Sequence, residues 1–424
     1  MRQMKDSGIE WIGLIPEKWN SIYAFQCFSQ VKNKNVGLAE TNLLSLSYGI
    51  LKRKNIDTVE GLLPESFETY NIIEKNDIVL RLTDLQNDQK SLRVGLCKER
   101  GIITSAYVTL RNKSKNLSPY LYYFLHSFDI AKGFYGMGAG VRQGLNWEEL
   151  KHVILLAPSV DEQSKIISHL DNQCTLVDNI IEKTKASIKE YKKLKQAIIT
   201  QAVTKGVRGD RPMKDSGIEW IGEIPEEWND INPKALFVQR KDKARQGERQ
   251  LTSSQLYGII YQDEYMEMTG SKVVTVEKDF DILKHVEVGD FVISMRSFQG
   301  GLEYSTRTGS ISSAYVMLIP NDKKVFSRYY RWLLKSSIYI NALQSTSNMV
   351  RDGQAMRYSN FAQIRLLEVP LEEQKEIADY LDEKCKKIDI LLDQKTRFIA
   401  ELESYKKSMI YEYVTGKKEV KYGS

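Results

Sequence analysis

The 424-residue sequence contains few of the residues that build metal centres and disulfide frameworks. It has four cysteines and four histidines, no Cys-x-x-Cys pair, and no spacing among these residues that suits a metal ion. We therefore expect reduced, partly buried cysteines in a cytoplasmic protein. The N-terminal residues show no apolar run after their basic residues, so no signal peptide is expected. No stretch approaches the ~18 continuous apolar residues of a membrane-spanning helix, and no membrane partner is expected.

The common motifs of nucleotide-binding and catalytic sites are also missing. No G-x-x-x-x-G-K-[ST] phosphate loop occurs, and the one glycine cluster, at residues 136–140, lacks the context of a dinucleotide-binding fold. There is no nucleophile elbow, no Asn-Pro-Pro-Tyr-like methyltransferase motif and no His/Asp/Glu constellation with metal spacing. We therefore expect a non-catalytic chain without a cofactor.

The net charge of +6, with a pI near 8.8, is mildly basic. An ordinary soluble protein explains this excess at least as well as an acidic partner does. The charge permits binding to nucleic acid and does not by itself indicate it.

What the sequence does contain is a motif that occurs twice. Residues 4–19 (MKDSGIEWIGLIPEKW) and 213–228 (MKDSGIEWIGEIPEEW) are identical at fourteen of sixteen positions. A second matching pair, residues 161–204 and 372–415, lies at nearly the same offset. Agreement of this extent indicates a tandem duplication. Each half brackets a variable region between constant segments, so we expect two different recognition tasks on one duplicated frame.

The repeats divide the chain into segments, in agreement with the two to three domains that its length predicts. The segments are a first motif (1–21), a first variable domain (22–157), a first long helix (158–204), a linker with the second motif (205–230), a second variable domain (231–369), a second long helix (370–416) and a short tail (417–424).

Each variable domain shows signals of both strands and helices. In the first domain, apolar runs between turn residues predict strands at 42–47, 77–82 and 102–110, and a helix at 119–134. The second domain repeats this outline with strands at 290–296 and 309–316, and a helix at 326–343. This order predicts an α+β fold in each half.

The two long segments carry the clearest periodicity, because a series of mostly apolar positions alternates at steps of four and three. In the first segment they are Leu170, Cys174, Val177, Ile181, Thr184, Ile188, Tyr191, Lys195, Ile198 and Ala202, and in the second Leu381, Cys385, Ile388, Leu392, Lys395, Ile399, Leu402, Lys406, Met409 and Tyr413. This is the period of a coiled-coil seam. We expect two globular domains joined by two long helices of ~43 residues, packed as an antiparallel coiled coil about a pseudo-twofold axis.

Four of the six tryptophans lie in the two copies of the motif. Aromatic side chains can serve as stacking platforms for bases. The same motif, however, precedes two different variable domains, so we expect the tryptophans to dock each half against the common frame.

These residues together resemble the DNA-specificity subunit of type I restriction–modification systems. The resemblance rests on the paired motif, on the P-x-x-E-Q-x-x-I start of the second long helix at residues 370–377, matched with one extra residue at 158–166, and on the Val-Thr ends of both helices. It covers essentially the whole chain, and the duplicated order makes it specific. The departures are Ala157, where the family has a second proline, and Lys205, where it has glycine.

The resemblance implies that the variable domains are target-recognition domains, each reading one half of a split, asymmetric DNA site. It implies that the helices form a spacer that also docks modification (methyltransferase) subunits. The implied partners are double-stranded DNA, two modification subunits per chain, and the restriction subunits (an ATP-dependent translocase and nuclease) of the full complex.

As candidate DNA-contacting residues we select donors and turn residues beside the aligned landmarks, because Arg and Gln pair bidentately with guanine and adenine. In the first domain these are Tyr48, Gly49, Lys52, Arg53, Lys54, Arg81, Thr83, Arg93, Arg142 and Gln143, and in the second they are Tyr257, Gly258, Gln262, Arg296, Ser297, Gln299, Arg351 and Arg357. A solvated surface charge is the more common role of any single one. Of the set, roughly half are expected to touch DNA.

Two other classes of function stay open at this point. A helical scaffold that binds only protein would not need two diverged domains. A standalone methyltransferase or nuclease would need the cofactor motifs that are missing. Selection from a degenerate duplex library, together with a methylation assay, separates the three classes.

Overall fold

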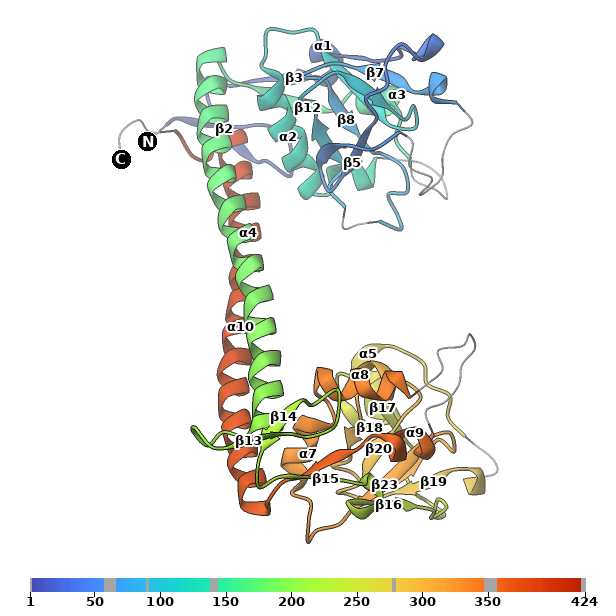
Figure 1. The fold of residues 1–424 in the computed structure, drawn as a ribbon. Coiled ribbons are helices and arrows are strands. Elements are labelled where there is room, and N and C mark those ends of the chain that lie inside the picture. Colours follow the sequence, from blue (N-terminus) through green and yellow to red (C-terminus); the bar gives the residue numbers. More distant parts are fainter. Residues whose placement is uncertain are drawn as a thin grey trace. The chain divides into compact units, whose positions relative to one another are not determined.

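The structure, a computed structural model, describes residues 2–56, 66–88, 91–137, 144–276, 280–346 and 357–420. They form two compact units (Figure 1). Unit 1 comprises Met1–Thr184 with Arg397–Ser424, and unit 2 comprises Lys185–Thr396. Each unit therefore contains one motif, one variable domain and a part of both long helices.

The two long helices are α4 (Val160–Lys205) and α10 (Leu371–Val414), of 46 and 44 residues. Each begins just after a proline, Pro158 or Pro370, and carries two acidic residues in its first turn. Proline suits the start of a helix, and negative charge is favourable near the N-terminal end of the helix dipole. The predicted helices and their approximate length are confirmed.

Within each unit, α4 and α10 run antiparallel and in the same register. In unit 1, Nζ of Lys406 lies 2.7 Å from a carboxylate oxygen of Asp178, and in unit 2 Lys195 and Asp389 make the same contact at 2.7 Å. Asp389 and Lys406 lie 211 residues after Asp178 and Lys195, respectively, so the two ion pairs are the two copies of one interaction. The pairs are largely exposed, so they select the register more than they add stability.

The predicted seam lies along the contact between the two helices. In unit 1, Leu170 and Cys174 of α4 share a core with Met409 and Ile410 of α10. In unit 2, the residues of α4 in the shared core are Ile199, Ala202 and Val203, and those of α10 are Leu381 and Cys385. The heptad pattern of the sequence therefore marks the buried faces correctly.

The two variable domains have the same sheet topology. The central antiparallel sheet of unit 1 has the order β4 (Phe28–Gln30), β11 (Val108–Asn112), β8 (Ile78–Leu80) and β9 (Val94–Leu96). Its counterpart in unit 2 has the order β16 (Phe237–Arg240), β23 (Val316–Pro320), β20 (Phe291–Ile293) and β21 (Glu303–Tyr304).

Within the described residues, four antiparallel strand pairs accompany the central sheet in each unit. In unit 1 they are β1 (Met4–Asp6) with β2 (Leu14–Pro16), β3 (Asn20–Tyr23) with β12 (Ile154–Ala157), β5 (Leu44–Ser47) with β6 (Ile50–Arg53), and β7 (Asn71–Ile73) with β10 (Gly101–Ile103). In unit 2 they are β13 (Met213–Asp215) with β14 (Glu223–Pro225), β15 (Asn229–Ile231) with β24 (Leu366–Glu368), β17 (Leu251–Ser254) with β18 (Gly258–Tyr261), and β19 (Lys284–Val286) with β22 (Gly309–Ile311).

Shorter helices cover the sheets. Unit 1 has α1 (Ala24–Cys27), α2 (Ser118–Ile130) and α3 (Trp147–Leu150), and unit 2 has α5 (Gln262–Thr269), α6 (Ser297–Gly300), α7 (Ser327–Leu333), α8 (Ser337–Ser345) and α9 (Tyr358–Gln363).

Three predicted elements are divided in the structure. The strand predicted at 102–110 is β10 and β11, because a turn closed by a hydrogen bond from the amide N of Tyr107 to the carbonyl O of Thr104 separates them. The strand predicted at 309–316 is likewise β22 followed by the start of β23. The helix predicted at 326–343 is α7 and α8, because the side chain of Ser336 caps a new helix through the amide of Tyr339.

The repeated motif is structural, as predicted. Nε1 of Trp19 donates a hydrogen bond of 2.9 Å to Glu162 in the first turn of α4. Nε1 of Trp228 makes the same bond, also 2.9 Å, to Glu373 in the first turn of α10. Both indoles are buried in the core of their unit, so neither is available as a stacking platform.

The α2 helix of unit 1 brings a buried imidazole against the end of α10. Burial lowers the pKa of His126 to about 4, with a further contribution from Lys406 and Lys407. Since this pKa lies below the ordinary value of 6.5, the neutral ring stabilises the folded state above pH 6.5, and this stabilisation is lost between pH 6.5 and 4.

We therefore predict that the free energy of unfolding of His126→Leu falls less steeply between pH 6.5 and 4 than that of the wild type. The difference in free energy of unfolding between the wild type and the variant should change by about 3 kcal/mol from pH 7 to pH 4. Chemical denaturation at a series of pH values measures it, with exposed His152→Leu as the control. A difference that does not vary with pH would contradict the assignment.

Candidate nucleic-acid interface

Strand register gathers three connections at one end of the unit 1 domain. Leu80, the last residue of β8, pairs with Val108, the first residue of β11, so residues 81–88 and the 104–107 turn leave the sheet at the same end. A parallel bridge between Leu43 and Ile102 directs the β5–β6 hairpin toward that end as well. We call this surface the loop end of unit 1.

Unit 2 has the same arrangement. Ile293 of β20 pairs with Val316 of β23, which places residues 294–300 and the 312–315 turn together. A parallel bridge between Gln250 and Ser310 directs the β17–β18 hairpin to the same side. We call this surface the loop end of unit 2. The connections at the two loop ends differ in sequence between the units, but the strands that support them have the same topology.

In unit 1, the 81–88 connection is organised around Arg93, which is fully buried. Its Nη1 donates to the carbonyl oxygens of Arg81 at 3.0 Å and Thr83 at 2.8 Å. Its Nη2 donates to the carbonyls of Asp84 and Asp88, and its Nε to the hydroxyl of Tyr135. The guanidinium thus satisfies main-chain acceptors that a loop would otherwise leave to water.

Asp129 of α2 completes this cluster. Its carboxylate accepts a hydrogen bond of 2.7 Å from the amide N of Arg93. Burial raises the pKa of Asp129 to about 6, and the amide bond and the positive charge of Arg93 oppose that rise. The arginine is therefore held in place by its main chain as well as by its side chain.

Unit 2 builds the equivalent connection without an arginine. Val79 and Val292 are equivalent residues of the two sheets, and they pair with Gly95 and Glu303, respectively. Two residues before these partners stand Arg93 in unit 1 and Gly301 in unit 2, so Gly301 occupies the position of Arg93. A Cβ at Gly301 would lie 2.2 Å from the carbonyl oxygen of Leu334. The connection preceding Gly301 is the single-turn helix α6.

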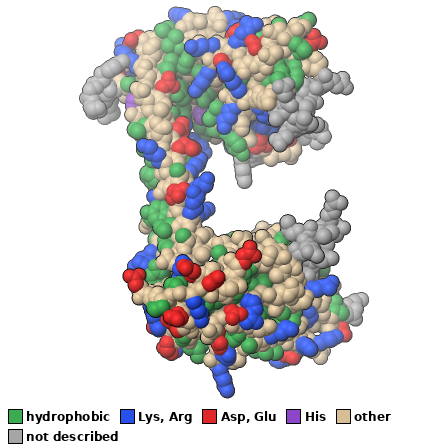
Figure 2. All heavy atoms as spheres, in the orientation of Figure 1, with side chains coloured by type: hydrophobic (Ala, Val, Ile, Leu, Met, Phe, Trp, Pro, Cys, Tyr) green, Lys and Arg blue, Asp and Glu red, His purple; other side chains and the backbone are tan. Residues whose placement is uncertain are grey.

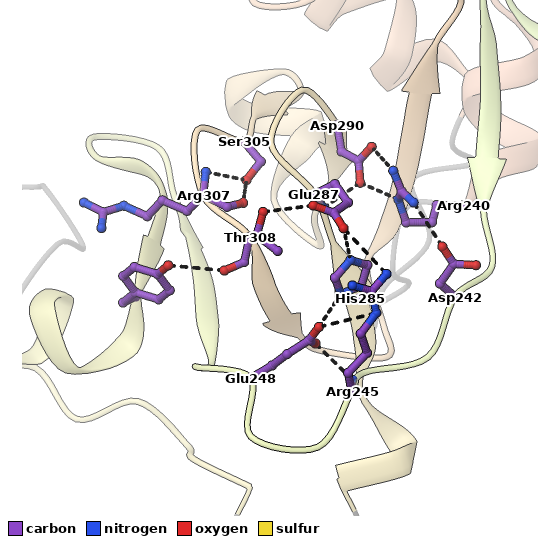
Figure 3. Close-up of polar contacts among 11 residues, drawn as sticks. Arg240, Asp242, Arg245, Glu248, His285, Glu287, Asp290, Ser305, Arg307 and Thr308 are labelled. Carbon is purple, nitrogen blue, oxygen red and sulfur yellow. Dashed lines mark hydrogen bonds and ion pairs between the residues drawn. The ribbon is translucent and has the colours of Figure 1, made fainter.

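The sheets of both units bury an aspartate that comes directly before β8 or β20. Asp77 receives two hydrogen bonds, of 2.9 and 2.7 Å, from Arg111 of β11. Asp290 receives two, of 2.7 and 3.0 Å, from Arg240 of β16 (Figure 3). The equivalent carboxylate thus receives its hydrogen bonds from an arginine on a different strand in each unit.

A second polar cluster fixes the segment that leads into the β17–β18 hairpin (Figure 3). The buried ring of His285 lies between two carboxylates, with Nδ1 2.6 Å from Glu248 and Nε2 2.7 Å from Glu287. Arg245 lies 3.6 Å from Glu287. Hydrogen bonds from His285 and Thr308 lower the pKa of Glu287. The cluster ties the 241–250 segment to the strands behind the loop end of unit 2.

The tip of the β5–β6 hairpin carries an unusual residue. Tyr48 and Gly49 form its two-residue loop, with φ values of 47° and 77°. Positive φ at both positions defines a type I′ turn, which favours Asn, Asp and Gly. A tyrosine held there costs roughly 1–3 kcal/mol, and its side chain is 73% exposed.

Several predicted DNA-contacting residues lie exposed in or near the two loop ends. In unit 1 they are Tyr48, the exposed Thr83 and the half-buried Arg81, and in unit 2 they are Tyr257, Arg296 and Gln299. Lys52 of β6 and Lys54 after it are exposed toward the base of the hairpin, and Arg357 is exposed just before α9. Gly49 and Gly258 take positive φ in the two hairpins, so their part is to shape the turns. Arg142, Gln143 and Arg351 lie outside the described residues.

Four predictions need correction or qualification. Arg93 is buried and holds a loop, so direct contact with DNA is excluded in this conformation. Ser297 is also buried, and its Oγ accepts a hydrogen bond of 2.8 Å from the amide of Ser294. Arg53 is exposed but paired with Glu99. The side chain of Gln262 is hydrogen-bonded to Thr275 and Val274.

The sequence reading missed the apolar residues at the hairpin tips. Leu256, 78% exposed, precedes Tyr257 in the three-residue loop of the β17–β18 hairpin, and Ile50 follows Gly49 in unit 1. The shared Tyr-Gly-Ile of the two hairpins is the signal that could have drawn attention to these flanking positions.

Charge alone does not locate an interface. On the visible face, Lys and Arg side chains lie among acidic ones in each unit (Figure 2). Among the residues that the structure describes, no group of three or more His, Cys, Asp or Glu side chains could hold a metal ion. Within the same residues, no helix is long and apolar enough to cross a membrane.

Comparison with known proteins gives full-length relatives. The chain is 25% identical over 431 residues to the type I restriction enzyme MjaX specificity subunit of Methanocaldococcus jannaschii, covering 97% of this chain and 96% of that protein. It is 23% identical over 430 residues to the MjaVIII specificity subunit of the same organism, covering 96% and 94%. No protein-family profile matches the chain.

Solved structures agree in fold. A chain from a structural study of complex assembly and conformational transition in the type I R-M system aligns with a TM-score of 0.67 at 14% identity, covering 95% of this chain and 99% of that one. The HsdS subunit of Thermoanaerobacter tengcongensis aligns with a TM-score of 0.51 at 13% identity, covering 95% and 98%.

The chain therefore has the fold of the specificity-subunit class, an α+β architecture with two long helices. In sequence it is related, along nearly its whole length, to the specificity subunits of type I restriction enzymes. The resemblance stated from the sequence is confirmed.

The Arg93 cluster yields a prediction on stability. Arg93→Met removes a buried side chain that donates to four main-chain carbonyls of residues 81–88, and it should lower the free energy of unfolding by about 3 kcal/mol. Denaturation curves measure this loss, and limited proteolysis should detect faster cleavage within residues 81–88.

The matched control is Arg53→Met, which removes an exposed arginine from the same unit and should cost under about 1 kcal/mol. Equal effects of the two substitutions would show that the interior contacts of Arg93 do not stabilise the loop.

Proposed function

We propose that this chain is the DNA-recognition subunit of a type I restriction–modification complex, acting in the cytoplasm and performing no catalysis itself. The observation that carries the proposal is the pairing of an unchanged topology with two different loop ends. The two units repeat every strand pairing, but the sequences of their exposed connections differ. This arrangement suits two domains that each recognise a different DNA sequence. The full-length relatives support the same conclusion.

In this proposal each loop end reads one half of a split, asymmetric DNA site. The candidate readers are exposed donors on connections that rigid strands support, namely Arg81 and Thr83 in unit 1 and Arg296 and Gln299 in unit 2. Lys52 and Lys54 suit phosphate contacts, which position a protein without reading sequence. The long helices, which belong in part to each unit, would serve as the spacer between half-sites.

The scaffold and standalone-enzyme alternatives find no support in these relatives, which are named specificity subunits. The direct test is selection from a degenerate duplex library by the full-length chain. We expect a consensus of two unrelated blocks separated by unread positions. A single continuous block, or no enrichment, would remove the proposal.

Arg296 provides the residue-level test. Arg296→Ala should relax one base position in one block, at a cost of about 1–3 kcal/mol in binding to the consensus duplex. The control is Arg365→Ala, which removes the same charge from unit 2 at a residue paired with Asp230 beside β24. Repeating the library selection with both variants measures the effect. A uniform loss over all sequences would make Arg296 a phosphate contact.

We also propose where the modification subunits bind. Leu194 of α4 is 48% exposed, and it directly precedes Lys195, which pairs with Asp389 of α10. Tyr405 of α10 occupies the equivalent position to Leu194 in the other repeat and is also exposed. Exposed apolar residues at matching places on a helix pair suit a partner helix laid against each unit, which gives two modification subunits per chain.

Leu194→Glu and Tyr405→Glu should each remove one of two modification subunits, and the double variant both. Gln196→Glu, an exposed position on α4 with the same change in charge, is the control and should leave the complex intact. Native mass spectrometry of the co-expressed complex counts the subunits. Retention of both subunits in the double variant would place the docking surface elsewhere, and circular dichroism checks that the helices remain folded.

A further inference from the structure

Both β-hairpins end in a large, exposed side chain. At the tip of β5–β6 it is Tyr48, and at the tip of β17–β18 it is Leu256, each about three-quarters exposed. The two loops differ by one residue in length. The same Tyr-Gly-Ile sequence nevertheless leads into the second strand of each hairpin, at residues 48–50 and 257–259. The apolar character of the tip is therefore common to two domains whose other exposed connections have diverged.

The fold gives no reason for a tyrosine at position 48. The side chain gains little from packing, because most of its surface is in solvent. Its backbone is held in the left-handed region, where Asn or Gly would fit without strain. A side chain that contributes little to folding and disfavours its own turn is best explained by a contact made with a partner.

The unit 1 tip is held by the domain behind it, and the unit 2 tip by its own hairpin. A Cβ on Gly49 would lie 3.1 Å from Cβ of Leu92 and 3.3 Å from the carbonyl oxygen of Val94, so the turn sits directly on β9. In unit 2, Oγ of Ser254 accepts hydrogen bonds of 3.3 Å from the amides of Leu256 and Tyr257. The exposed side chains are thus presented on rigid supports.

A feature common to both readers must serve something common to both half-sites. Two different base sequences share the phosphate backbone, the groove and the base stack. Phosphates attract charged and polar groups, whereas the faces of stacked bases are the apolar surface of a duplex. Leucine and tyrosine share no hydrogen-bonding group on their side chains, so reading base edges by hydrogen bonds cannot be their common task.

We infer that Tyr48 and Leu256 are wedges that insert between base pairs, each opening one base step in its half-site. This inference rests on the proposed function, because it requires each loop end to meet a duplex. Apolar side chains that enter a base step unstack it and bend the DNA, which lets more of the protein surface reach the grooves. Base discrimination is left to the donors on the neighbouring connections.

The decisive variant is Tyr48→Asn, which removes the ring and places a favoured residue in the turn. The probe is a duplex carrying the split site that the full-length wild-type chain selects from a random library. We expect binding at least tenfold weaker on the intact duplex, with the same consensus in a repeated selection. Tyr48→Trp, which keeps a ring, should bind within about twofold of the wild type.

A set of duplexes nicked at one successive step each then locates the wedge. A nick loosens the stack without removing a base. At one step the difference between the wild type and Tyr48→Asn should shrink to about twofold, because the unstacking no longer has to be driven by the ring. Leu256→Ser should show the same behaviour at one step of the other half-site.

The control is Phe25→Asn, which removes an exposed aromatic ring of unit 1 at the opposite end of the sheet, next to β4. It should bind as the wild type does. Wild-type affinity of Tyr48→Asn, a loss that no nick reduces, or a changed base in the consensus would each overturn the inference. Failure of the wild type to select any split site would instead reject the proposed function.

Discussion

Each unit depends on the hydrogen bond from a buried motif tryptophan to a glutamate in the first turn of a long helix. Glu373 has no solvent exposure, and its carboxylate is surrounded by Trp228 and Arg211. A buried carboxylate without such partners would cost several kcal/mol. In unit 1 the same places are taken by Glu162, Trp19 and Arg2. The near-identity of the two motifs follows from this requirement.

The C-terminal end of the other long helix, α10 in unit 1 and α4 in unit 2, is bonded to the same core. In unit 1 the hydroxyl of Tyr120 donates to the carbonyl of Val414, and in unit 2 that of Tyr329 donates to Val203. A motif, a variable domain and the ends of both long helices thus share one hydrophobic core in each unit. A recognition domain therefore sits on a support that does not depend on its exposed connections.

Within the two domains, equivalent polar groups have partners on different strands, although the sheet topology is the same. The buried aspartate before β8 or β20 receives its arginine from β11 in one unit and from β16 in the other. Arg53 at the end of β6 pairs with Glu99, whereas Tyr261 at the end of β18 stacks under Arg307. Each exchange keeps the buried or bridging group satisfied, which explains how the sequences could diverge while the sheets did not.

The sequence predicted the features that depend on local pattern or repetition. The seam of α4 and α10 is visible because its period continues over many turns, and the role of the tryptophans follows from their recurrence before different domains. The division of 102–110 into two strands was not predictable, because the apolar character continues through a turn that only the pairing partners define. The division of 326–343 has a similar cause, since Ser336 resembles any helical serine until its cap is seen.

The position of Arg93 shows why the candidate site was harder to predict than the fold. An arginine is expected at the surface, and nothing near it in the sequence announces four main-chain acceptors. Those acceptors come from residues 81–88, which meet Arg93 only when β8 and β9 pair. A buried residue can therefore decide whether Thr83 and Arg81 are presented in a fixed geometry. Rigid presentation reduces the ordering cost of binding, so we expect that, if this loop end reads DNA as proposed, the arginine is kept while the exposed residues around it vary.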